Sequence, residues 1–179
     1  MIALSPVQRK FILHWGEMGT RWGINRTVAQ VHALLFITAV PLPADEIVEL
    51  LSVARSNVST SIKELLGWGI IRVVHVTGDR RDYFESMRDV WEMFRVIVEE
   101  RKKREIDPTL ILLRECVAEV EKRKSSADAV AKERLGELLH FFETMTGWYS
   151  QMRKIPTGVL LKAVKLGDNV FKLMGGKSR

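Results

Sequence analysis

Apolar residues recur every three to four positions over most of the chain, and this spacing predicts a mainly helical protein. Ser5-Pro6 and Asn25 have the residue types of helix N-termini, and Pro43 suits the first turn of another helix. The pattern breaks near residues 19–24, 41–43 and 155–156, where Gly or Pro occurs. Helices are therefore expected near residues 8–18, 25–38, 43–51, 54–67, 89–104, from 107 onward, and at 126–152 and 159–174.

The spacing changes from helical to alternating between residues 70 and 87. Residues 70–76 are rich in β-branched side chains, residues 77–82 form a polar turn, and residues 83–87 return as a second strand. Three helices followed by one hairpin, with a short turn between the last two helices, is the order of a winged helix-turn-helix domain. The predicted fold is therefore mainly α (α+β), with one β-hairpin wing followed by a C-terminal helical dimerisation region.

This order divides the 179 residues into four expected segments. Residues 1–24 supply an N-terminal helix that contributes to dimerisation, and residues 25–88 form the winged helix-turn-helix domain. Residues 89–174 form a helical dimerisation region, and residues 175–179 form a disordered tail. A chain of this length is expected to bury a core large enough to fold without disulfides or a structural metal.

The helix expected at residues 54–67 carries polar side chains opposite its apolar ones, which include Val58, Ile62 and Leu65. Ser, Asn and Thr are poor helix formers, so their concentration here favours a functional face over an ordinary solvated one. These types can form hydrogen bonds with base edges and phosphates in a major groove. The residues predicted to contact DNA are Arg55, Ser56, Asn57, Ser59, Thr60 and Lys63.

The turn of the expected hairpin contains Gly78-Asp79-Arg80-Arg81. A glycine-bearing turn at the tip of a two-stranded ribbon can present Arg80 and Arg81 to a minor groove and to a phosphate. Asp79 or Asp82 is expected to pair with one of these arginines. Taken alone, the pattern is equally typical of a charged surface turn.

Three segments together resemble the MarR family of winged-helix regulators, namely residues 56–65, 68–72 and 78–85. More narrowly, the same segments resemble the GbsR-like branch, named for a regulator of glycine betaine synthesis, and residues 41–47 also match that branch. The resemblance covers about residues 20–90, and the C-terminal half only in length and type. It implies a sequence-specific transcription regulator. Members of the family are typically repressors, and a small ligand often relieves the repression. It also implies a homodimer on a pseudo-palindromic operator, joined through its N-terminal and C-terminal helices.

The five tryptophans raise the question of a ligand site. Aromatic faces bind quaternary ammonium groups by cation–π attraction, and the GbsR-like resemblance makes a choline-type effector a hypothesis worth naming. Packing in the core or at an interface is the simpler interpretation, and it is the one favoured here.

The sequence shows no pattern typical of catalysis or metal binding. It lacks a Gly-rich phosphate loop, a Gly-x-Ser-x-Gly elbow and a His-Glu-x-x-His pair, and its four histidines lie far apart. The single cysteine, Cys116, has apolar neighbours and is expected to be a buried, inert thiol. We therefore expect no enzyme activity, no cofactor and no metal.

The formal net charge is +6, with most of the excess in the second half of the chain. A basic balance fits a nucleic-acid partner without requiring one. No targeting or membrane-spanning segment is recognised, and one cysteine suits a reducing compartment, so a cytoplasmic protein without membrane contact is expected. The basic run at residues 101–104 is interpreted as a solvated linker between helices.

A winged-helix domain can also serve as a protein-interaction module that does not bind DNA. Such a module would be expected to carry aromatic anchors on the exposed face of the helix at residues 54–67. The polar residues found there favour DNA binding instead.

Overall fold

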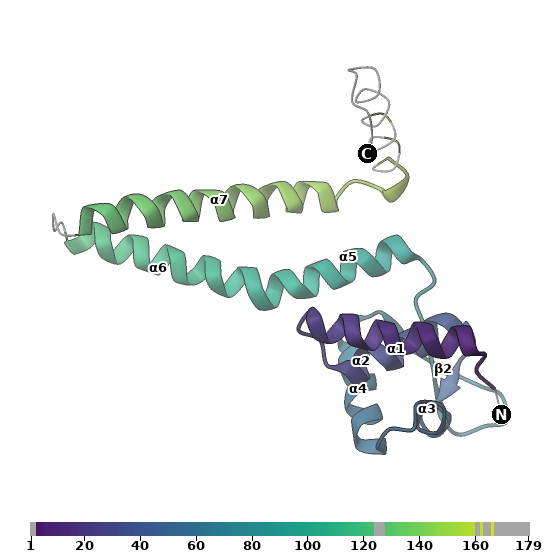
Figure 1. The fold of residues 1–179 in the computed structure, drawn as a ribbon. Coiled ribbons are helices and arrows are strands. Elements are labelled where there is room, and N and C mark those ends of the chain that lie inside the picture. Colours follow the sequence, from purple (N-terminus) through teal and green to yellow (C-terminus); the bar gives the residue numbers. More distant parts are fainter. Residues whose placement is uncertain (1–2, 124–127, 160–161, 163–165, 167–179) are drawn as a thin grey trace. The chain divides into compact units, whose positions relative to one another are not determined.

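The computed structural model describes residues 3–123, 128–159, 162 and 166 (Figure 1). The chain forms two compact units, Met1–Val98 and Glu99–Arg179. The elements in chain order are α1 (Pro6–Arg21), α2 (Arg26–Thr38), β1 (Leu42–Pro43), α3 (Ala44–Leu51), α4 (Arg55–Trp68), β2 (Ile71–His75), β3 (Asp82–Ser86), α5 (Val90–Arg101), the π-helix η1 (Lys102–Ile106), α6 (Asp107–Arg123) and α7 (Ala129–Arg153). This mainly helical fold with one small antiparallel sheet confirms the predicted fold class.

The first helix is longer than its sequence pattern suggests, because its glycines serve packing rather than helix termination. α1 begins with a capping box, in which Ser5 and Gln8 each accept a hydrogen bond from the other's backbone N–H. It continues through Gly19 to Arg21. A Cβ atom at Gly19 would lie only 2.5 Å from the Cβ of Ala29 on α2. Glycine at this position therefore lets α1 and α2 approach closely.

The sheet has three strands, in the order β1-β3-β2, rather than the expected two. Phe84 of β3 lies opposite Leu42 of β1 on one side and Val73 of β2 on the other. β1 is only two residues long, and its partner strand follows about forty positions later, so local periodicity gave no signal for it. Asp82, expected in the turn, is the first residue of β3.

The core of the first unit is built around α2. Every α2 residue from position 28 to 35 is buried, so this helix has neighbours on all sides. Ile47 of α3, Leu65 of α4 and Phe84 of β3 pack in the same cluster. Met93 of α5 also lies in it, so the first turns of α5 belong to this unit. This packing fixes α3, α4 and the hairpin around one helix.

The second unit contains a helical hairpin. Arg114 pairs with Glu143 at 2.9 Å, and Glu121 pairs with Lys132 at 3.9 Å, so α6 and α7 run antiparallel. The interpretation of residues 101–104 as a linker is wrong, because α5, η1 and α6 follow one another without a break. Ion pairs between Arg101 and Glu105 and between Lys102 and Asp107 lie within this stretch. Most of the helix expected at residues 159–174, and the tail expected at 175–179, fall outside the described residues.

Candidate nucleic-acid interface

Helix α4 has one buried face and one exposed face. Val58, Ile62 and Leu65 are buried, and Ser61 lies with them in the interior. The exposed face carries all the residues of this helix that were predicted to contact DNA, namely Arg55, Ser56, Asn57, Ser59, Thr60 and Lys63. The structure therefore presents these six side chains to solvent from a single helix.

The turn before α4 fixes the direction of that helix. α3 ends at Leu51, and the next residue, Ser52, has a φ of 54° in the left-handed region. α4 begins three residues after Ser52. Nη1 of Arg55 lies 2.8 Å from Oδ1 of Asp45, in the first turn of α3. Arg55 is still 74% exposed, so this ion pair adds little stability. It does link the start of α3 to the start of α4 and restricts the positions of the Arg55 guanidinium.

The wing tip is organised by Asp79, Arg81 and Tyr83. Nη2 of Arg81 donates to Oδ2 of Asp79 at 2.7 Å, and the hydroxyl of Tyr83 donates to the same oxygen at 2.7 Å. The backbone N–H of Arg81 donates to Oδ1 of Asp79 at 2.9 Å, and Nη2 of Arg81 also donates to the Tyr83 hydroxyl at 2.9 Å. An aspartate was expected to pair with one of the two wing arginines, and the structure shows that Asp79 pairs with Arg81.

This network makes the two wing arginines electrostatically different. The hydrogen bond from Arg81 is the main cause that lowers the pKa of Asp79 well below its usual range, so the carboxylate stays ionised. The same contact raises the pKa of Arg81, and the hydrogen bond to Asp79 raises that of Tyr83. Arg80 is exposed and pairs with no acidic side chain in the described part of the chain. Its charge is therefore the one left unopposed at the wing tip.

The strands behind the tip are joined by further pairs of polar side chains. Arg72 and Glu85, which face each other across β2 and β3, form an ion pair. Three steps further along the ladder, His75 Nδ1 lies 3.8 Å from a carboxylate oxygen of Asp82. Cross-strand pairs of this kind support the register of an exposed ribbon.

Sequence reasoning missed the role of Tyr83, which was assigned only to the returning strand. Asp79, Arg81 and Tyr83 alternate along the chain, and in extended backbone alternate side chains share a face. The spacing of two residues between Asp79, Arg81 and Tyr83 therefore could have predicted that their side chains are in contact. The contact between Asp45 and Arg55 was not foreseen either, because it depends on the angle between α3 and α4.

Two further features of the structure concern metal binding and membrane insertion. Over the residues it describes, no three His, Cys, Asp or Glu side chains gather in a way that would hold a metal ion. Within the same ranges, no helix combines the length and apolar character needed to cross a membrane.

Comparison with known proteins gives two matches that bear on this interface. Residues 22–82 match the sequence model of the MarR family. A crystal structure of a transcriptional regulator is similar with a TM-score of 0.53 and 20% sequence identity, over 83% of this chain and 96% of that one. No match is found among the curated proteins. The family match covers less than half of the chain and does not single out the GbsR-like branch. It shows that residues 22–82 are similar to the MarR family, and the likeness to the solved structure supports the fold.

Proposed function

We propose that this chain is a transcription regulator that binds double-stranded DNA with α4 in the major groove and the wing beside it. The exposed polar face of α4 carries this proposal. Its six outward side chains offer donors and acceptors, while the large apolar residues Val58, Ile62 and Leu65 point into the core. A major groove about 12 Å wide admits one helix, and such side chains discriminate base pairs there.

The same face argues against an interaction module that has lost DNA binding. Interfaces between proteins concentrate aromatic side chains and Met at their centres. The outward residues of α4 from position 55 to 63 include no aromatic residue and no Met. The wing adds an exposed Arg80 on a rigid turn, which suits a phosphate or a narrow minor groove.

The regulator is proposed to act as a homodimer on a pseudo-palindromic operator. Leu138, Phe141, Met145 and Trp148 of α7 follow the three-and-four spacing of a helix–helix seam and are 44–57% exposed. Exposed apolar residues in such a row mark an interaction site. A second copy of the same row is the occupant proposed here, because an isologous contact would pair identical faces. Repression by competition with transcription belongs to this proposal too. So does assignment to the GbsR-like branch, which rests on the resemblance of residues 41–47, 56–65, 68–72 and 78–85.

DNA binding is tested by fluorescence anisotropy with the full chain and duplexes from upstream of its own gene. The expected result is at least one duplex bound about a thousandfold tighter than a scrambled duplex of equal length at the same salt concentration. The matched variant carries Arg80→Ala and Arg81→Ala together, and its affinity should fall less steeply with salt because fewer counterions are released. Equal, weak affinity for every duplex would contradict the proposal and favour the interaction module.

A further inference from the structure

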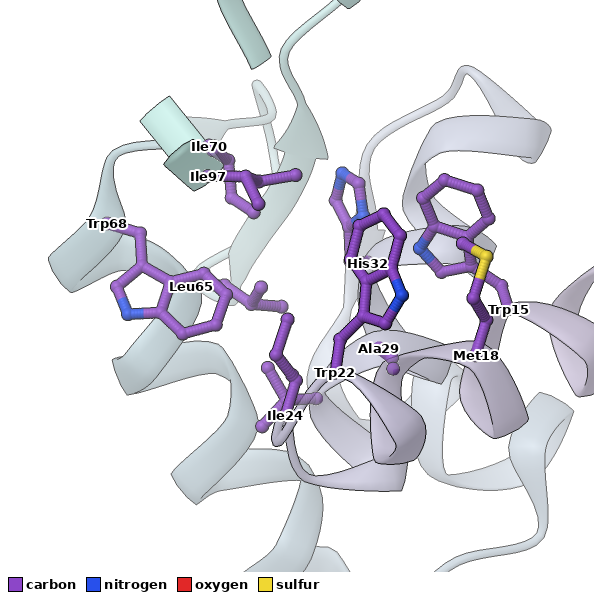
Figure 2. A pocket seen from close by; sticks show the side chains of 12 residues that line it. Trp15, Met18, Trp22, Ile24, Ala29, His32, Leu65, Trp68, Ile70 and Ile97 are labelled. Carbon is purple, nitrogen blue, oxygen red and sulfur yellow. The ribbon is translucent and has the colours of Figure 1, made fainter. Parts of the chain in front are cut away.

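Helix α4 is held in different ways at its two ends. Leu65 and Trp68, in its last turn, line the apolar cavity beside His32 (Figure 2). At the other end, Nη1 of Arg55 lies 2.8 Å from Oδ1 of Asp45 on α3. Arg55 is the first residue of α4, and recognition helices contact base edges mainly with their N-terminal residues. The ion pair therefore lies at the end of the helix that is best placed to read DNA.

Helix stability does not account for an arginine at this position. The N-terminus of a helix carries a partial positive charge, which disfavours a cation. The first turn of α4 contains no acidic residue, and Ala54 before it provides no side-chain cap. Asp45, in contrast, lies in the first turn of α3, where the helix dipole favours a carboxylate without help from Arg55. The pairing thus fixes the position of Arg55 more than it stabilises either helix.

The ion pair holds the guanidinium of Arg55 but leaves most of its donors free. Oδ1 of Asp45 is buried and accepts no hydrogen bond of good geometry from the described residues. Departure of Arg55 would leave this buried oxygen without a cation, which is unfavourable. A guanidinium carries several N–H donors in one rigid plane, and the side chain of Arg55 is 74% exposed. Arg55 is thus held at one nitrogen and presents its remaining donors to solvent.

We propose that Asp45 is a positioning residue, which orients Arg55 to donate two hydrogen bonds to O6 and N7 of a guanine in the major groove. Guanine is the base that offers two adjacent acceptors there, and the planar fork of an arginine matches them. The assignment rests on the proposed function. It adds the base that α4 selects and a residue outside α4 that enforces the selection.

A phosphate is a less suitable partner for this arginine. Affinity for the DNA backbone depends on net positive charge, and Asp45 offsets the charge of Arg55 from 2.8 Å away. Selection of a base depends instead on the direction of the donors, which the carboxylate restricts. Lys63, also on the exposed face of α4, has no acidic partner in the described part of the chain and suits a phosphate better.

The guanine contact is tested with duplexes in which each base pair of the preferred operator is replaced in turn. Fluorescence anisotropy with the unmodified full chain should identify at least one G·C pair whose replacement weakens binding about tenfold. Arg55→Ala should lose the preference at that pair and keep the others. Equal weakening of every duplex by Arg55→Ala, or loss of the preference at an A·T pair instead, would overturn the guanine contact.

The role of Asp45 is tested with Asp45→Ala on the same duplexes. The preference at the base pair that Arg55 reads should fall about threefold or more, while the other preferences stay unchanged. Adding Asp45→Ala to Arg55→Ala should cause no further loss there, because Asp45 acts only through Arg55. Asp45→Asn keeps the shape of the side chain and an acceptor oxygen, so it should recover part of the preference. An unchanged preference in Asp45→Ala, or equal losses at all base pairs, would overturn the positioning role.

Glu46→Ala is the matched control, because Glu46 has the same charge in the same turn of α3 but is not the partner of Arg55. Both variants remove one negative charge and should bind every duplex slightly more tightly, but only Asp45→Ala should change the preference. Thermal unfolding followed by circular dichroism checks that each variant is folded. Failure of the unmodified chain to prefer any duplex would contradict the proposed function itself. A guanine preference that does not depend on Asp45 would contradict only the positioning role.

Discussion

Nε and Nη2 of Arg81 face the two carboxylate oxygens of Asp79, at 3.2 Å from Oδ1 and 2.7 Å from Oδ2. This two-point contact, closed by Tyr83, turns the wing tip into a defined structure although all three residues lie near solvent. It also gives adjacent arginines different tasks. Arg81 holds the turn, and Arg80 offers the uncompensated charge.

Arg80→Ala and Arg81→Ala are therefore expected to differ in their effect on salt dependence. Loss of Arg80 should reduce the slope of log affinity against log salt by about one, because one phosphate contact disappears. Loss of Arg81 should reduce it by less, since Asp79 already neutralises this guanidinium. Anisotropy titrations at four or more salt concentrations measure both slopes. Identical slopes for the two variants would show that the proposed division is wrong.

Asp79→Asn should lower the preference for the operator over a scrambled duplex by several-fold. The substitution weakens the contact that orders the turn, while the loss of a negative charge near DNA favours binding to any duplex. Competition titrations with both duplexes measure the ratio. Asp82→Asn is the matched control, because the His75–Asp82 pair is longer at 3.8 Å and more exposed. That control should keep the wild-type preference.

Asn57→Ala and Lys63→Ala separate base reading from phosphate binding on α4. An amide can pair with an adenine edge, so loss of Asn57 should cost about 1–3 kcal/mol on the preferred duplex and relax selectivity at one base pair. Loss of Lys63 should weaken binding about equally on all duplexes. Binding to a panel of single-base operator variants distinguishes the two patterns. A uniform loss for Asn57→Ala would count against base contact by that residue.

His32 should make the free energy of unfolding depend on pH in the acid range. Its pKa is lowered from 6.5 to about 4 in the folded protein, so the unfolded chain takes up the proton first as the pH falls. Stability is then complete above pH 6.5 and declines by about 3 kcal/mol as the pH approaches 4. Urea unfolding at several pH values measures this, and His32→Phe should lack that component. Parallel curves for the two proteins would contradict the burial of a neutral imidazole.

Two acidic residues in the row on α7 should break the proposed dimer. Phe141→Asp with Met145→Asp places like charges at the facing positions of both copies, and light scattering after gel filtration should show a monomer. Val130→Asp is the control, since Val130 is 69% exposed and lies outside the row. Circular dichroism would check that the helices persist. A dimer that survives the double substitution would move the interface elsewhere, for example to the exposed Val7 and Leu13 of α1.

Sequence patterns predicted the structure correctly where it depends on residues that are close together in the chain. Asn25 accepts a hydrogen bond from the backbone of Thr27, and α2 begins where this cap predicts. Gly69, with φ of 75°, ends α4 within a residue of the expected position. The polar face of α4 followed from the 3.6-residue period, because its buried and exposed positions alternate with the helix turn. Each of these features depends on residues fewer than five positions apart.

Residues distant in sequence decided what the local pattern left open. The pairing of β1 with β3 and the contact between Asp45 and Arg55 both depend on where separate elements are packed. The cavity beside His32 exists because α1, α2, α4 and α5 leave a space among large rings that no single helix pattern records. The sequence by itself determined the helices, the hairpin and the polar face of α4, since backbone hydrogen bonds and periodicity are local. Only the tertiary structure decided that Arg81 pairs with Asp79, that Nε2 of His32 is buried without a partner among the described residues, and that β1 completes the sheet. Each of these depends on surfaces that folding brings together.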